Sequence, residues 1–158
     1  MYYLLISFFL AHSFAFAQDP DSIFMANGVS QAWQTKKVMA TPESVIYHKK
    51  AEVLYVSNMN GGAQEKNGKG FISKVKANGE IVEKNFITNL NAPKGMAIQN
   101  GLLYVTDIDA IKAFEIKTGK LAKCLKAKGA EFLNDLAVTA GGKVIATDMY
   151  KHRLYVVK

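Results

Sequence analysis

The stretch that decides the fold runs from Gly95 to Asp107 and reads GMAIQNGLLYVTD. It returns as DLAVTAGGKVIATD at Asp135–Asp148 and, earlier in the chain, as ESVIYHKKAEVLYVSN at Glu43–Asn58. Each copy has a short apolar strand, a polar or glycine-rich turn, and a second strand of β-branched and aromatic residues. Each second strand ends in Ser or Thr followed by Asp or Asn. Strand composition and turn chemistry agree in all three copies, so the repeat predicts three β-hairpins.

Another hairpin follows the second strand in the first two copies. It turns at Asn78-Gly79 and at Thr118-Gly119, and Asn-Gly is a strong hairpin signal. Four-stranded units that recur at roughly 40–50 residues, as these do, are typical of β-propeller blades. We therefore predict an all-β chain that forms a partial β-propeller of about three four-stranded blades. The blades would cover about residues 31–90, 91–130 and 131–158, within a domain of residues 18–158.

The N-terminal residues have the pattern of a secretory signal peptide. Met1–Ala17 contains no Asp, Glu, Lys or Arg, has an apolar core at Leu4–Leu10, and ends in Ala15-Phe16-Ala17. This pattern predicts cleavage before Gln18 and a periplasmic or extracellular location. The apolar run is shorter than the roughly 20 residues of a membrane span, so we expect no stable membrane insertion after signal removal. The alternative is an N-terminal membrane anchor, because no Lys or Arg lies near Met1.

The charge of the chain comes mostly from lysine. The formal net charge is +7, and a basic patch can bind nucleic acid. Here the lysines alternate along predicted strands, which is how sheet edges resist aggregation. We therefore expect a solvated face and no nucleic-acid partner. Cys124 is the only cysteine, so no disulfide can form within the chain.

Polar residues gather at one end of the predicted blades. Successive strands of a meander run in opposite directions, so each first strand begins at the end where the second strand stops. First strands begin near Glu43, Lys94, Asn134 and Asp135, and the first strands of a propeller line its central channel. Oxygen ligands that converge there suit a hard divalent cation, since Ca²⁺ takes about 6–8 oxygens. We take Glu43 and Asn134 as candidate metal ligands.

Further polar residues at the same end are candidates for a face that contacts a substrate. They are Asn58, Asn60, Asp107, Asp135 and Asp148. For the three that follow Ser or Thr at second-strand ends, the alternative is structural, because Asp and Asn there form local hydrogen bonds with the backbone. The repeat alignment sets Glu43 level with Gly95 and Asp135. A position that changes from blade to blade is more typical of a site than of a repeat consensus.

Three segments of the chain together resemble a known family. They are TPESV at Thr41–Val45, GMAI with LYVTD within Gly95–Asp107, and FLNDLAV at Phe132–Val138. They are similar to segments of the senescence marker protein/gluconolactonase family. Its members are six-bladed propellers, and some are metal-dependent lactone hydrolases. The resemblance covers about Trp33 to Lys158 and implies that this chain supplies the N-terminal half of such a six-bladed ring.

The resemblance also implies a ligand set. Glu43 matches the metal-binding Glu of the family's first blade, and Asn134 matches an Asn that lies near metal and substrate. It implies a divalent cation, Ca²⁺, Mg²⁺, Mn²⁺ or Zn²⁺, and a small-molecule substrate such as a lactone. The family's Arg is Phe132 here, which removes a charge that contacts the sugar lactone. The family's other metal ligands would lie beyond Lys158, and no catalytic residue is assigned.

Two functions from different classes fit these observations. One is a metal-dependent lactone or ester hydrolase, in which Glu43 and Asn134 bind the ion. The other is a non-enzymatic binding module that presents its loop face, including Asn58–Gly70, to a ligand or protein. A third interpretation is a truncated, inactive fragment. Because half a ring would expose apolar blade faces to water, we expect a homodimer that completes six blades.

The signal-peptide pattern gives a direct prediction. When the full chain is expressed in a bacterium, the protein should appear in the periplasm with Gln18 at its N-terminus, because small residues occupy positions 15 and 17. N-terminal sequencing of the periplasmic fraction checks this. A membrane-bound product that retains Met1 would instead establish an anchor.

Overall fold

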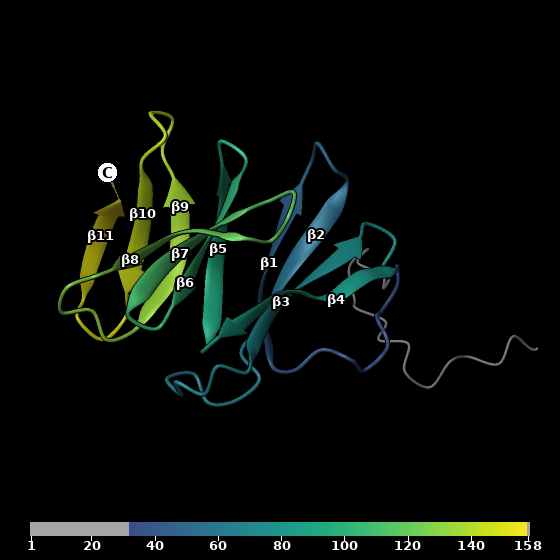
Figure 1. Cartoon of the computed structure of the whole chain (residues 1–158), viewed down its shortest axis with the longest axis horizontal. Coiled ribbons are helices and arrows are strands. Elements are labelled where there is room, and N and C mark those ends of the chain that lie inside the picture. Colours follow the sequence, from purple (N-terminus) through teal and green to yellow (C-terminus); the bar gives the residue numbers. More distant parts are fainter. Residues whose placement is uncertain (1–31, 158) are drawn as a thin grey trace, which may run out of the picture. The chain divides into compact units, whose positions relative to one another are not determined.

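The computed structural model describes residues 32–157, which form eleven β-strands in three antiparallel sheets (Figure 1). Blade 1 contains β1 (Pro42–His48), β2 (Val53–Asn58), β3 (Gly70–Lys76) and β4 (Ile81–Leu90). Blade 2 contains β5 (Pro93–Gln99), β6 (Leu102–Asp107), β7 (Ala110–Glu115) and β8 (Leu121–Lys126). Blade 3 contains β9 (Leu133–Val138), β10 (Val144–Asp148) and β11 (Arg153–Val157). In every blade the strands neighbour one another in chain order.

This architecture confirms the all-β prediction. Within the described residues the sheets have four, four and three strands, and the strands occur where the hairpin repeat predicts them. The signal peptide predicted at residues 1–17 lies outside the described residues. No helix between residues 32 and 157 has the length and hydropathy needed to cross a membrane.

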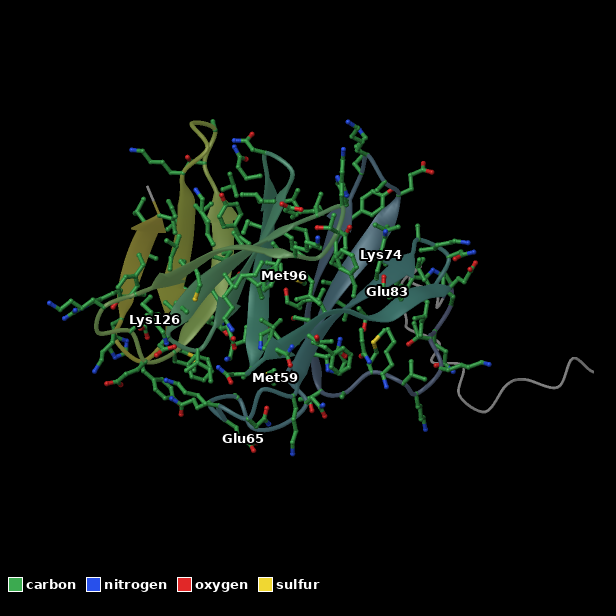
Figure 2. All side chains as sticks on the ribbon, viewed as in Figure 1. Met59, Glu65, Lys74, Glu83, Met96 and Lys126 are labelled. Carbon is green, nitrogen blue, oxygen red and sulfur yellow. The ribbon has the colours of Figure 1, made fainter. Side chains whose placement is uncertain are left out.

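The core lies between neighbouring blades. The first strands β1, β5 and β9 lie side by side (Figure 1), so that blade 2 packs against blade 1 on one face and blade 3 on the other. Tyr55 and Ile72 of blade 1 share a buried cluster with Met96 and Leu103 of blade 2; Met96 is labelled in Figure 2. Burial of this apolar surface is the main force that holds the blades together.

A second, smaller cluster lies between blades 2 and 3. It is formed by Ile111, Leu133 and Ala146, with Leu136 and Tyr155 packed against it. Because strand side chains alternate between the two faces of a sheet, blade 2 buries both of its faces. Blades 1 and 3 each have one face without a neighbouring blade among the described residues.

Each first strand has a β-bulge at the same place. In blade 1, Pro42 pairs with Asn58 and Val45 pairs with Val56, so Glu43 and Ser44 together face one residue of β2. The same shift occurs between Pro93 and Met96 in blade 2 and opposite the stretch between Ala146 and Asp148 in blade 3. Bulges re-aim side chains and often lie beside functional sites.

The strand pairing corrects the repeat alignment. In the observed register, Glu43 is equivalent to Lys94 and Asn134, while Ser44 is equivalent to Gly95 and Asp135. The alignment that set Glu43 level with Gly95 was therefore wrong by one residue. The hairpin turn of blade 1 covers residues 49–52 and that of blade 2 residues 100–101. The sequence alignment allowed for a longer turn in blade 1 but made the difference one residue too large.

Gly95 allows β5 and β9 to approach each other closely. A Cβ atom at this position would lie 2.5 Å from the Cα of Asp135 and 2.6 Å from the carbonyl oxygen of Asn134. Both of these are backbone atoms, which cannot rotate away as a flexible side chain would. Glycine at position 95 is therefore explained by packing between blades.

We predict that Gly95→Ala destabilises the protein by about 1–3 kcal/mol, because the added methyl group forces the two backbones apart. Urea unfolding followed by circular dichroism measures this. Gly141→Ala is the matched control, since its Cβ would contact only Thr139 Oγ1, at 3.9 Å. Equal unfolding midpoints for the two variants would contradict the close approach of β5 to β9.

Candidate functional site

The hydroxyl groups at the second-strand ends fill the bulges. Ser57 Oγ accepts a hydrogen bond from the backbone N–H of Ser44 at 3.0 Å. Thr147 Oγ1 accepts one from the backbone N–H of Asp135, also at 3.0 Å. A bulge withdraws such groups from the strand ladder, and a buried backbone group needs a partner. The Ser or Thr of the repeat thus stabilises the first strand of its own blade.

Thr106 occupies the equivalent position in blade 2, but its hydroxyl faces carbonyl oxygens and also reaches the next blade. Its Oγ1 lies 3.3 Å from the carbonyl oxygen of Gly95 and donates to the carbonyl oxygen of Asn134 at 2.7 Å. A single hydroxyl therefore joins β6 to the bulge of its own blade and to the bulge of blade 3.

The Asp or Asn that follows holds the segment entering the blade. Asn58, Asp107 and Asp148 are all buried. Each accepts hydrogen bonds from the backbone of that segment: Asn58 from Ala40 at 3.0 Å, Asp107 from Ala92 at 2.9 Å, and Asp148 from Glu131 at 2.9 Å. These contacts are structural, as the alternative considered from the sequence expected, but the quoted partners lie 15–18 residues earlier in the chain and are not local.

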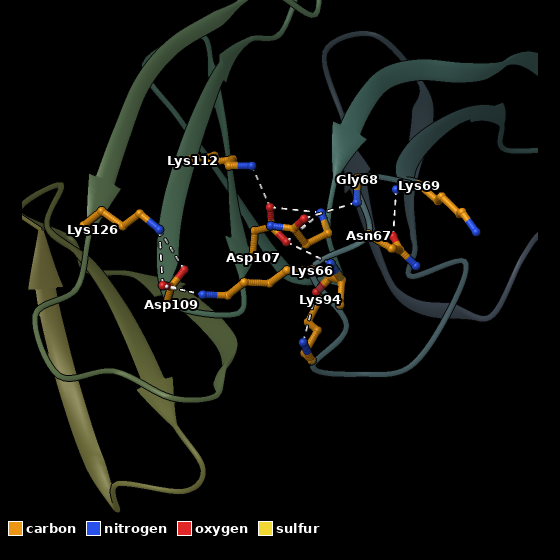
Figure 3. Close-up of polar contacts among 11 residues, drawn as sticks. Lys66, Asn67, Gly68, Lys69, Lys94, Asp107, Asp109, Lys112 and Lys126 are labelled. Carbon is orange, nitrogen blue, oxygen red and sulfur yellow. Dashed lines mark hydrogen bonds and ion pairs between the residues drawn. The ribbon is translucent and has the colours of Figure 1, made fainter.

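The two aspartates differ in how their charge is balanced. Asp107 Oδ2 accepts a hydrogen bond from Lys112 Nζ at 2.6 Å (Figure 3). Asp148 accepts four backbone N–H groups, those of Glu131, Phe132, Tyr150 and Lys151. Burial opposes ionisation of Asp148, but the four hydrogen bonds favour the carboxylate and lower its pKa below the ordinary value.

The insertion between β2 and β3 is tied to blade 2. Asn60 closes the base of this loop by donating to the carbonyl oxygen of Lys69 at 3.0 Å. Lys66 Nζ lies 2.9 Å from Asp109, which also pairs with Lys126 at 3.1 Å (Figure 3). The candidate loop face is therefore anchored at its base and by a charged contact between blades.

The inner strand ends carry Glu43, the residues Lys94 and Asp135, whose charges act on it, and Asn134, which precedes Asp135 in β9. Glu43 and Asp135 are exposed, Asn134 is half-buried, and Lys94 is buried, with 1% of its surface accessible. Partial burial raises the pKa of Glu43; the positive charge of Lys94 lowers it, and the negative charge of Asp135 raises it again. The net shift is upward, so Lys94 does not fully offset the other two effects.

Lys94 was not among the candidate residues, although it occupies the same register position as Glu43 and Asn134. Its Nζ donates to the carbonyl oxygen of Ala92 at 2.9 Å and lies 4.5 Å from the centre of the Phe132 ring. Burial lowers the pKa of Lys94, while the charges of Asp107 and Glu43 act in the opposite direction. The sequence does place Lys94 at a first-strand start, but it does not show that Lys94 is buried or that its charge acts on Glu43.

The oxygen donors fit a hard divalent cation only in part. Glu43, Asp135 and Asn134 offer two carboxylates and one amide, which are the ligand types that Ca²⁺ and Mg²⁺ prefer. Three side chains are fewer than the roughly 6–8 oxygens that Ca²⁺ takes. No group of three or more His, Cys, Asp or Glu residues gathers within the described part of the chain. The set therefore suits weak binding of a cation that keeps several waters.

No protein-family model matches the sequence, and no curated protein matches it. Solved structures do match. The designed propeller protein Ika4 is 13% identical, with a TM-score of 0.50 over 73% of this chain and 64% of its own. The designed Ika8 gives the same identity and TM-score over 73% of this chain and 32% of its own.

The third match is hydrazine synthase of Kuenenia stuttgartiensis, with 13% identity and a TM-score of 0.53 over 85% of this chain and 38% of its own. This chain thus spans less than two thirds of each matched structure. At this identity the three similarities show the fold alone: three β-sheets arranged like propeller blades.

Asp148→Asn should destabilise the protein by at least about 2 kcal/mol at neutral pH, because converging N–H groups lose a charged acceptor. The folded pKa of Asp148 is lowered, so its stabilisation is present above the unfolded value of about 3.9 and is lost as pH falls through the folded pKa. Urea unfolding of both proteins from neutral to acidic pH checks this.

The matched control is Glu80→Gln, which removes an exposed carboxylate paired with Lys76; such surface pairs contribute about 0–1 kcal/mol. A stability difference between wild type and Asp148→Asn that stayed constant down to the most acidic pH would contradict the assigned role.

Proposed function

We propose that this chain is a secreted β-propeller binding module that holds a hard divalent cation weakly at its inner strand ends. Glu43 and Asp135 would supply the charged ligands and Asn134 the neutral one. The observation that carries this proposal is the position of two exposed carboxylates, Glu43 and Asp135, at the bulges of first strands from different blades. Partial burial is the main cause of the raised pKa of Glu43, and the charge of Asp135 adds to it.

Electrostatics support a cation here. Two like charges held near each other cost free energy, and a cation between them relieves that cost. Lys94 relieves only part of it, because its ammonium group is directed to the Ala92 carbonyl and the Phe132 ring. Partial burial and the charge of Asp135 together keep the pKa of Glu43 raised with Lys94 present.

The ligand class follows from the same chemistry. A hard cation with few protein ligands keeps open positions that oxygen atoms of a small molecule can occupy. A polyoxygenated compound such as a lactone fits that description. When bound, the cation would supply polarisation of a carbonyl group. The residues of this chain would orient that group through Asn134 and the two carboxylates.

A metal-dependent lactone or ester hydrolase is the second candidate. The specific observation in its favour is the raised pKa of Glu43, because a carboxylate of raised pKa is a better general base. Lactone turnover separates the two candidates. A binding module binds a lactone without hydrolysing it, whereas a hydrolase turns it over and loses that activity in Glu43→Gln.

Calorimetric titration of the full chain with CaCl₂ tests the cation site. We expect a dissociation constant of roughly 10⁻⁴–10⁻³ M, as for weak extracellular calcium sites. Glu43→Gln and Asp135→Asn should each weaken binding by about tenfold or more, because each removes a charged ligand. Glu52→Gln, an exposed carboxylate in the turn at the far end of β1, should leave binding unchanged.

Two outcomes would reject the site. One is submicromolar Ca²⁺ binding that Glu43→Gln does not change, which would place the cation elsewhere. The other is no binding of Ca²⁺ or Mg²⁺ at millimolar concentration.

A further inference from the structure

Two sheet faces expose apolar side chains at matched positions. On blade 1, Val45 and Tyr47 are 59% and 47% exposed; on blade 3, Leu154 and Val156 are 67% and 50% exposed. In each pair the residues are two apart on one strand, so they lie on the same face of the sheet. Contiguous exposed apolar residues of this kind mark interaction surfaces.

The strand register shows that the residues equivalent to Leu154 in the other two blades are buried. The third strand of each blade has an aliphatic residue opposite the Ser or Thr of the second strand: Ile72 opposite Ser57, Ile111 opposite Thr106, and Leu154 opposite Thr147. The two isoleucines are buried. Leu154, at the same position, is exposed because no blade covers it within the described residues.

The residues equivalent to Val45 in the other two blades likewise pack against the preceding blade. The first residue after each bulge is Val45 in β1, Met96 in β5 and Leu136 in β9. Met96 shares a buried cluster with Ile72 of the preceding blade. Leu136 packs on the cluster that contains Ile111 of the preceding blade.

Both interfaces within the chain therefore use the same pair of positions. The third-strand isoleucine of one blade and the first-strand residue after the bulge of the next blade belong to one apolar cluster or pack on it. Leu154 occupies the third-strand position in blade 3, and Val45 occupies the first-strand position in blade 1. Among the described residues, each lacks the other member of this pair.

A hydrogen bond accompanies the contact between blades 2 and 3. Thr106 donates to the carbonyl oxygen of Asn134 at 2.7 Å. Thr147 occupies the position of Thr106 in blade 3 and is exposed. The backbone position equivalent to Asn134 in blade 1 is Glu43. Blade 3 thus offers the donor, and blade 1 the acceptor, of the same bond.

We propose that a second copy of this chain covers these faces, with blade 3 of each copy packed on blade 1 of the other. Leu154 of one copy then contacts Val45 of the second copy, and Thr147 faces the carbonyl oxygen of its Glu43. Each chain carries both Leu154 and Val45. Two copies related by a twofold axis therefore form the contact twice, once at each junction, and the assembly is closed. The resulting ring has six blades, within the range of about 4–8 found in propellers.

The pairing does not depend on cation binding, although it would affect the proposed site. In the ring, β1 of each copy lies beside β9 of the second copy, as β5 lies beside β9 within the chain. Both sets of Glu43, Asn134 and Asp135 then lie at one channel mouth. The assembly is therefore tested in the presence of EDTA, so that a failed cation site and a failed dimer are distinguishable.

Sedimentation velocity of the full chain at micromolar concentration tests the proposal. The wild type should have twice the mass of the chain. Leu154→Lys and Val45→Glu should each raise the dimer dissociation constant by roughly 100-fold or more, since a charge enters a buried apolar contact. The double variant should regain the dimer, because the introduced Lys and Glu meet across the interface.

Leu121→Lys is the matched control, since Leu121 is 56% exposed on the outer strand of blade 2 and should leave the dimer intact. Circular dichroism verifies that each variant folds; Leu154 and Val45 are exposed, so neither substitution disturbs the core of one chain. A wild-type monomer, an open series of larger polymers, or a dimer that survives Leu154→Lys would each overturn the proposal.

Discussion

The structure depends on a pair of side chains at the end of each second strand. The Ser or Thr hydroxyl contacts backbone groups that the bulge removes from the ladder, and the neighbouring Asp or Asn binds the segment that enters the blade. A buried backbone group without a partner costs about 1–3 kcal/mol, so the two side chains stabilise both the bulge and the connection. The bulge in turn positions Glu43, Lys94 and Asn134 at the inner strand ends.

Much of this fold could be predicted from the sequence, because strand and turn signals are local. Alternating apolar residues, Asn-Gly turns and a recurring Ser/Thr–Asp/Asn ending identify the strands and the end of the blade where polar residues gather. The bulge could not be predicted, because it has no signature of its own. All three first strands share the bulge, so it does not explain why Glu43 was aligned with Gly95 instead of Lys94. That misalignment comes from the turn of blade 1, residues 49–52, which is longer than the turn of blade 2, residues 100–101.

The candidate site shows the same limit in chemical terms. Sequence position indicates that Asp107 and Asp135 lie at one end of the blades. It does not indicate which of the two carboxylates accepts hydrogen bonds from the backbone of the entering segment. Asp107 is buried and binds the Asn91 and Ala92 N–H groups and Lys112, whereas Asp135 is exposed beside Glu43. In the sequence alignment, Gly95 is one form of a position that varies between blades as a site residue would. In the structure, a glycine is needed there because β5 packs closely on β9.

Lys94 gives a physical reason for an aromatic residue at position 132. A lysine that is 99% removed from solvent needs partners for its ammonium group, and here it has one carbonyl oxygen and the face of the Phe132 ring. An arginine at position 132 would place a second positive charge against Lys94 instead of an attractive π-face. Lys94 and Phe132 are therefore coupled, because the ring accepts the ammonium group that burial has removed from water. With Lys94 held in this way, the proposed cation site rests on Glu43 and Asp135, which are exposed at the inner strand ends.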